Sequence, residues 1–175
     1  LLEQTTVVTP TDTRVITTGV PFLLITPDAR AAGMGELGVA TSPDTYSQQW
    51  NPAKYAFAKE QIGVGISYTP YLSDLVNDIF LGNLTFYNRI SERSAWSASI
   101  KYFSLGEIEI ITQQQADIGN FTPLIERPNE LAIDASYALR LSDQFAMSVT
   151  GRFLRSDLKL QSQPDTEANA ASTFA

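Results

Sequence analysis

Three glycines in the first quarter of the chain are spaced as in nucleotide-binding proteins. Gly33, Gly35 and Gly38 in "GMGELG" fit G-x-G-x-x-G. This pattern binds a pyrophosphate only where a buried strand leads into it and a helix leaves it. Here "PDARAA" precedes the glycines, and the stretch that follows them contains two prolines and no helical apolar stripe. The context therefore argues against a dinucleotide site.

Other reactive side chains are sparse. Glu107 and Glu109 alternate in "GEIEI", and paired carboxylates can perform acid–base chemistry. The chain has no histidine and no cysteine, which excludes Ser-His-Asp and Cys-His catalysis and thiolate metal sites. We therefore interpret the two glutamates as solvated and predict no catalytic residue, metal or cofactor. The net charge of -7 argues against a nucleic-acid partner.

The elements that carry the remaining polar residues are predicted strands. Apolar and polar residues alternate with period two, which is typical of a strand with one apolar face. We predict five such strands, at 61–69, 79–89, 95–104, 129–140 and 145–156, and a sixth beginning in "ASTFA" at 171–175. Residues 1–20 are predicted to form an extended arm. Residues 21–60 are predicted to form compact irregular structure with one short helix near Pro52 to Ala58.

Strand length and loop length together indicate a membrane β-barrel. The strands approach the roughly 9–11 residues that a tilted membrane strand needs. Long connections (70–78, 105–128 and 156–170) alternate with the short turns "ISERS" and "LSDQ", and aromatic residues gather near strand ends. A bacterial barrel closes with an even number of strands, at least about 8. We therefore expect residues 61–175 to be the first five to six strands of a longer protein. A secreted soluble β-sandwich is the structural alternative.

A resemblance to a known family sharpens this expectation. The stretch "PFLLITPDARAAGMGELGVATSPDTYSQQWNPAKYAF" resembles the N-terminal signature of the PorV (LptO) family, and "GRFLRSDLKL" and "ASTFA" are also similar to it. These proteins are outer-membrane components of the type IX secretion system in Bacteroidetes. They resemble FadL fatty-acid transporters, which share an Asn-Pro-Ala element, here Asn51, Pro52 and Ala53. The resemblance implies a barrel of about fourteen strands, of which this chain covers roughly the first half.

The resemblance also implies a role for the glycines. In FadL-like proteins the segment before the first strand folds into the barrel as a plug. Residues 21–60 would form that plug, in which Gly33, Gly35 and Gly38 serve close packing and unusual backbone angles. Asn51 and Pro52 would shape the turn into the first strand. The long connections would then face the cell exterior and the short turns the periplasm.

Two groups of residues are candidates for function. The polar, lumen-facing sides of the strands carry Lys101, Asp134 and Arg152. These charges either pin the plug or simply satisfy one another, as lumen charges usually do. The predicted outer loop exposes Tyr71, Leu72, Leu75 and Val76, which either bind a partner or pack on the barrel rim.

The resemblance implies a non-enzymatic shuttle. Its partners would be the giant type IX translocon barrel, the C-terminal signal domains of exported cargo, the surface attachment complex and outer-membrane lipid. The alternative is a FadL-like transporter of small hydrophobic molecules. A third possibility, lipopolysaccharide deacylation, is suggested by the family's second name, but no catalytic constellation supports it.

Overall fold

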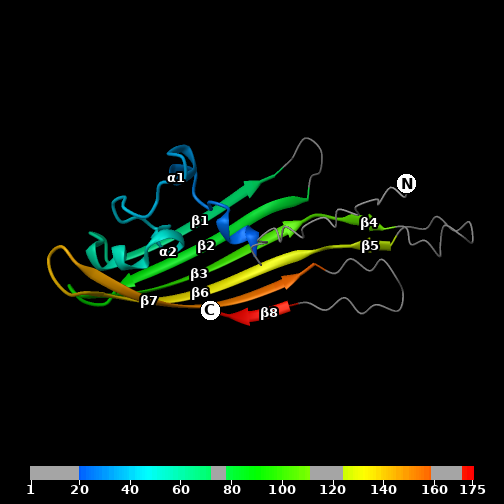
Figure 1. Cartoon of the computed structure of the whole chain (residues 1–175). Coiled ribbons are helices and arrows are strands. Elements are labelled where there is room, and N and C mark those ends of the chain that lie inside the picture. Colours follow the sequence, from blue (N-terminus) through cyan, green and yellow to red (C-terminus); the bar gives the residue numbers. More distant parts are fainter. Residues whose placement is uncertain (1–19, 72–77, 111–123, 159–170) are drawn as a thin grey trace, which may run out of the picture.

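A single antiparallel sheet dominates the protein. The computed structural model describes residues 20–71, 78–110, 124–158 and 171–175. Its six-stranded sheet has the order β1-β2-β3-β6-β7-β8, so the strands of this sheet lie side by side in chain order (Figure 1). The strands are β1 (Ile62–Pro70), β2 (Ile79–Arg89), β3 (Ser94–Leu105), β6 (Asn129–Arg140), β7 (Ala146–Asp157) and β8 (Ala171–Phe174). The all-β prediction and the six predicted strands are confirmed.

The sheet is covered on its polar face and open on its apolar face. The buried positions of β3 and β6 include Ser97, Ser99, Asp134 and Ser136. The opposite face presents large apolar side chains, among which Ile66 is 75% exposed and Val149 is 74% exposed. We call the covered side the inner face and the other side the outer face. This arrangement is the reverse of a soluble sheet, in which the apolar face packs on the core.

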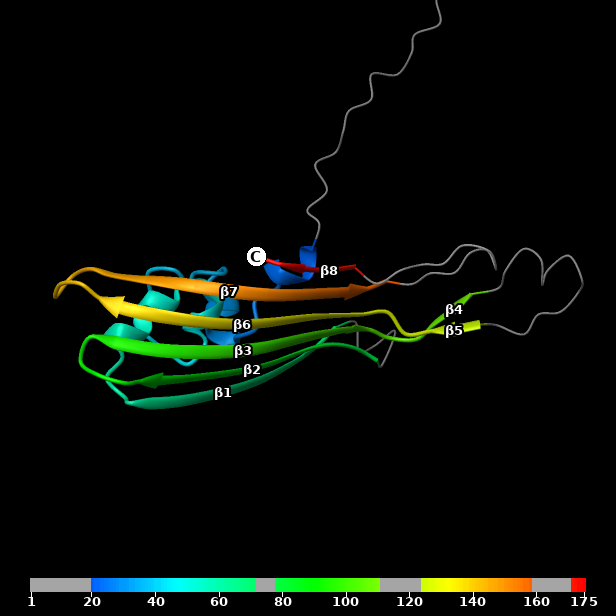
Figure 2. The same ribbon diagram turned by 90° about the horizontal axis from the view of Figure 1, so that it is seen from below.

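Residues 20–60, the covering segment, lie across the inner face (Figures 1 and 2). Within the described residues the segment contains four short helices: η1 (Pro21–Leu24), α1 (Ala29–Gly33), α2 (Ser47–Trp50) and η2 (Pro52–Phe57). The predicted helix near Pro52 is present as η2. The other three were not predicted, because helices of four or five residues are too short to show an apolar period.

Two apolar clusters fix the ends of the covering segment to the sheet. One contains Tyr55, Ala56 and Ala58 of the segment with Tyr87, Ala95 and Ala138 of the strands. The other joins Phe22 to Leu81, Ala132 and Leu154. Small residues on β3 and β6 leave room for the bulky rings of the segment, and Tyr55 stacks on Tyr87 with ring centroids 4.5 Å apart. Burial of these side chains is the main apolar stabilisation of the inner face.

Long and short connections lie at opposite ends of the sheet. The turns at 90–93 and 141–145 are at one end, and the three longer connections leave from the other (Figures 1 and 2). One of the longer connections carries the hairpin of β4 (Ile108–Ile110) and β5 (Leu124–Glu126), which extends past the end of the sheet. In the described part of the chain, no helix is long and apolar enough to cross a membrane.

Candidate functional site

The glycine motif follows a helix instead of opening one. Asp28 caps the start of α1 by accepting a hydrogen bond from the Ala31 amide at 2.6 Å, and the helix ends at Gly33. Gly35 then adopts a left-handed φ of 75°. A pyrophosphate site needs the free amides of a helix N-terminus, and here the motif lies at the C-terminus. The glycine motif therefore forms the end of α1 and the turn after it.

The three glycines differ in what they do. A Cβ on Gly38 would lie 2.2 Å from Cγ of Trp50, so the tryptophan ring packs directly on the glycine backbone. Gly35 supplies the positive φ of the turn. At Gly33 a Cβ would meet no atom within 4 Å and the backbone is helical, so neither reason for glycine applies there.

The Asn-Pro-Ala element starts η2. The Asn51 side chain caps this helix by accepting a hydrogen bond from the Ala53 amide at 3.1 Å, and Pro52 occupies the first turn. Asn51 also ends α2, so it separates the two helices in an extended conformation. Ala53 is buried. The element therefore fixes the position of η2, whose Tyr55 reaches the sheet.

The structure brings Asp134 and Arg152 together and places Lys101 in a different contact. Arg152 binds Asp134 through two parallel hydrogen bonds, Nε to Oδ1 at 2.6 Å and Nη2 to Oδ2 at 2.8 Å. Lys101 instead donates to Oε1 of Gln49 at 2.5 Å and to the Ile25 carbonyl at 3.4 Å, both in the covering segment. Asp134 and Arg152 thus satisfy one another, while Lys101 contacts the covering segment.

Next to Gln49, the Gln48 side chain bridges two strands. Its Oε1 accepts from Ser97 of β3 at 2.6 Å, and its Nε2 donates to Ser136 of β6 at 2.6 Å. Ser136 in turn bonds Thr150 of β7 at 2.8 Å. Neither glutamine was predicted from the sequence, because two amide side chains in an irregular segment carry no local signal of their partners.

A buried lysine bonds the loop that follows the glycine motif. Lys54 Nζ donates to the Gly38 carbonyl at 2.8 Å and to Oγ1 of Thr41 at 3.0 Å. Burial lowers the pKa of Lys54. The loop from Gly38 to Thr41 is thereby tied to η2.

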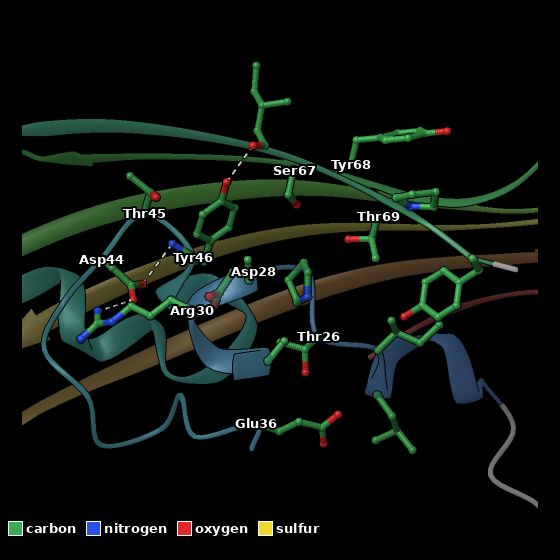
Figure 3. Close-up of a pocket in the computed structure, with 18 residues that line it drawn as sticks. Thr26, Asp28, Arg30, Glu36, Asp44, Thr45, Tyr46, Ser67, Tyr68 and Thr69 are labelled. Carbon is green, nitrogen blue, oxygen red and sulfur yellow. Dashed lines mark hydrogen bonds and ion pairs between the residues drawn. The ribbon is translucent and has the colours of Figure 1, made fainter. Parts of the chain in front are cut away.

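A cavity of about 1040 Å³ separates β1 from the covering segment (Figure 3). At one side the Tyr46 hydroxyl donates to the Ile66 carbonyl at 2.8 Å, and Arg30 pairs with Asp44 at 3.3 Å. Thr26 and Ser67, which are labelled in Figure 3, have buried hydroxyl oxygens with no partner in the described residues. The cavity combines mostly apolar walls with a few polar groups, which suits binding more than reaction chemistry.

The remaining predicted residues lie near the long connections. Tyr71 is half-buried and packs edge-on against Phe103 with ring centroids 6.1 Å apart. Leu72, Leu75 and Val76 lie outside the described residues. Glu107 forms an ion pair with Arg127, and Glu109 is exposed. In the described stretches, no group of three or more acidic side chains is arranged to hold a metal ion.

Comparison with known proteins identifies a family. A family model described as "Type IX secretion system protein PorV" matches residues 8–175, which is nearly the whole chain. A search of the curated proteins finds no match.

Proposed function

Because the chain belongs to the PorV family of type IX secretion system proteins, we propose that it is part of an outer-membrane β-barrel that receives exported cargo. The barrel accepts the C-terminal signal domain of a cargo protein at the giant translocon barrel. It then delivers the cargo to the surface attachment complex. The observation that carries the membrane part of this proposal is the reversed burial of the sheet.

The outer face supports contact with lipid. An isolated apolar sheet face in water would be an aggregation hazard, whereas a barrel in lipid requires one. Aromatic residues form a row near the long connections, with Tyr68, Phe80 and Tyr102 at ring distances of 5.2 and 6.0 Å. A second group near the short turns pairs Phe86 with Trp96 at 5.1 Å. Aromatic girdles at the two membrane interfaces have this arrangement.

The covering segment is the plug of this barrel. Its polar contacts with the inner face are those of a segment inside a polar lumen, and its two apolar clusters hold it there. An open sheet edge is not stable in lipid, so the barrel closes with strands beyond the six described here. A plugged lumen favours carriage of cargo on the barrel over passage through it.

Cargo binding takes place at the end of the sheet that carries the long connections. The β4–β5 hairpin and Tyr71 lie at this end, which is the cell exterior in the proposed orientation. The proposed function is recognition and release of cargo, which requires a contact surface and no catalytic group. Tyr71, Leu72, Leu75 and Val76 remain the first candidates for the contact.

One observation favours a second function. The cavity beside β1 has mainly apolar walls with a few polar groups, as a site for a small amphiphile would have. A FadL-like transporter of hydrophobic molecules would use such a space, with the plug moving to admit the ligand.

Affinity purification from outer membranes in mild detergent separates the two functions. The tagged protein is isolated beside a tagged, unrelated outer-membrane barrel, and bound proteins and lipids are identified by mass spectrometry. Specific recovery of a very large barrel and of proteins that share a C-terminal signal domain supports the shuttle. Recovery of the barrel with a bound apolar ligand and without these proteins supports the transporter and contradicts the shuttle.

A further inference from the structure

The covering segment is held to the strands by side chains alone. In the described residues, no backbone–backbone hydrogen bond joins residues 20–60 to any strand of the sheet. The segment is therefore not a seventh strand or an integral part of the wall. Its attachment depends on the two apolar clusters at its ends and on the side-chain hydrogen bonds between them.

Between the clusters, the side-chain bonds to β3 and β6 are concentrated on two adjacent residues, while the Tyr46 hydroxyl bonds the Ile66 carbonyl of β1. Gln48 spans Ser97 and Ser136, and Gln49 accepts from Lys101 while its Nε2 donates to the Leu23 carbonyl at 2.8 Å. Neither apolar cluster includes a residue of α2. The helix thus lies against β3 and β6 through polar contacts, although Ser47 is 0% and Gln48 only 3% exposed.

Polar and apolar attachments differ in how easily they open. A hydrogen bond lost to water is largely replaced by bonds to water, so its net contribution is small. An apolar cluster that opens exposes its area to water and has no such replacement. The contact of α2 is therefore the weakest part of the attachment, and the Tyr55 cluster is a stronger one.

We propose that Gln48 and Gln49, together with their partners Ser97, Ser136 and Lys101, form a latch. Opening of this latch releases α2 from the inner face. The hinge is Asn51, the extended residue between α2 and η2. Release uncovers the polar inner face of β3 and β6 and breaks the bond from the Gln48 amide to the Tyr55 hydroxyl, while the Tyr55 ring, stacked on Tyr87, keeps η2 in place. This inference rests on the contacts alone and is independent of the identity of any cargo.

Single cysteines report the opening, because the chain has none of its own. Ser47→Cys places a nearly isosteric thiol in α2, and Ala56→Cys places one in η2, where Ala56 is 1% exposed. Each is introduced separately into the whole natural protein in detergent, with any cysteine outside these 175 residues replaced by serine, and its rate of reaction with a maleimide is measured. The first thiol reports release of α2, and the second reports loss of the whole covering segment.

The latch is then weakened from both sides. Gln48→Met keeps the side chain's size and removes its hydrogen bonds, whereas Ser97→Ala removes one bond from the wall. Ser99→Ala is the matched control, because Ser99 is buried on the same face of the same strand and bonds Asp134 at 3.4 Å. We expect Gln48→Met to raise labelling of Ser47→Cys on the order of tenfold, and Ser97→Ala to raise it less.

Labelling of Ala56→Cys is expected to stay unchanged in both latch variants, and Ser99→Ala is expected to leave both thiols protected. The latch is refuted if Gln48→Met and Ser97→Ala leave the Ser47→Cys rate unchanged, or if Ser99→Ala raises it equally. An equal rise at Ala56→Cys also overturns the proposal, because the segment would then leave the sheet as one unit.

Discussion

The Tyr55 hydroxyl makes the most demanding contact in the covering segment. Tyr55 is 1% exposed, and its hydroxyl donates to the Thr45 carbonyl at 2.9 Å and accepts from the Gln48 amide at 2.8 Å. Tyr55→Phe leaves the ring stack intact and removes both bonds. The buried Gln48 amide and the part-buried Thr45 carbonyl then lose this partner, at about 1–3 kcal/mol for a fully buried group before relaxation. We expect a loss of roughly 2–4 kcal/mol in the free energy of docking the segment.

The neighbouring ring provides a matched control. Tyr87 stacks on Tyr55, and its hydroxyl makes no hydrogen bond within the described parts of the chain. Tyr87→Phe is therefore expected to cost much less. Denaturant unfolding of the whole protein in detergent is followed by the fluorescence of Trp50 alone, with Trp96 and any tryptophan outside these 175 residues replaced by phenylalanine. Equal midpoints for the Tyr55→Phe and Tyr87→Phe variants would refute the assignment of these hydrogen bonds.

Three further outcomes follow from the same contacts. Gly38→Ala forces its methyl group into the Trp50 ring, so the docked segment should lose about 1–3 kcal/mol and Trp50 fluorescence should shift. Burial raises the pKa of Tyr55 above its ordinary 10.0, so the free energy of docking the segment should be fully present below pH 10 and should decrease as the pH rises above it. Tyr55→Phe should remove this decrease at alkaline pH. Phe22→Ala empties a buried site beside Phe103 and should speed proteolysis of the segment near its start, whereas the exposed Leu24→Ala should not.

The strands could be predicted because their signal is local. In "QIGVGISYT" the alternation is visible within nine residues, and the structure has β1 at Ile62–Pro70. The short "LSDQ" turn likewise fixes the register that sets Asp134 opposite Arg152. Period and turn length together determine which side chains share a face, so the placement of these two residues opposite each other is encoded locally.

Contacts between the covering segment and the sheet could not be predicted in this way. Gln48 and Ser136 are separated by 88 positions, and no periodic pattern relates an irregular segment to a strand that distant. For the same reason the bond from Lys101 to Gln49 could not be predicted, although Lys101 was expected on the same lumen face as Asp134 and Arg152. The glycines were predicted to serve close packing and unusual backbone angles, but not which glycine does which: Gly35 supplies the unusual angle, Gly38 packs on a tryptophan ring, and neither reason applies at Gly33.

The central claim is that cargo is bound at the long-connection end, and site-specific photocrosslinking in living cells tests it most directly. A photoreactive amino acid replaces Glu109 of the β4 strand in one variant and Glu92 of a short turn in the other; both glutamates are exposed. We predict that the Glu109 variant crosslinks to proteins with the C-terminal signal domain and the Glu92 variant does not. Cargo captured from Glu92, or from neither position while the translocon is active, would contradict the account.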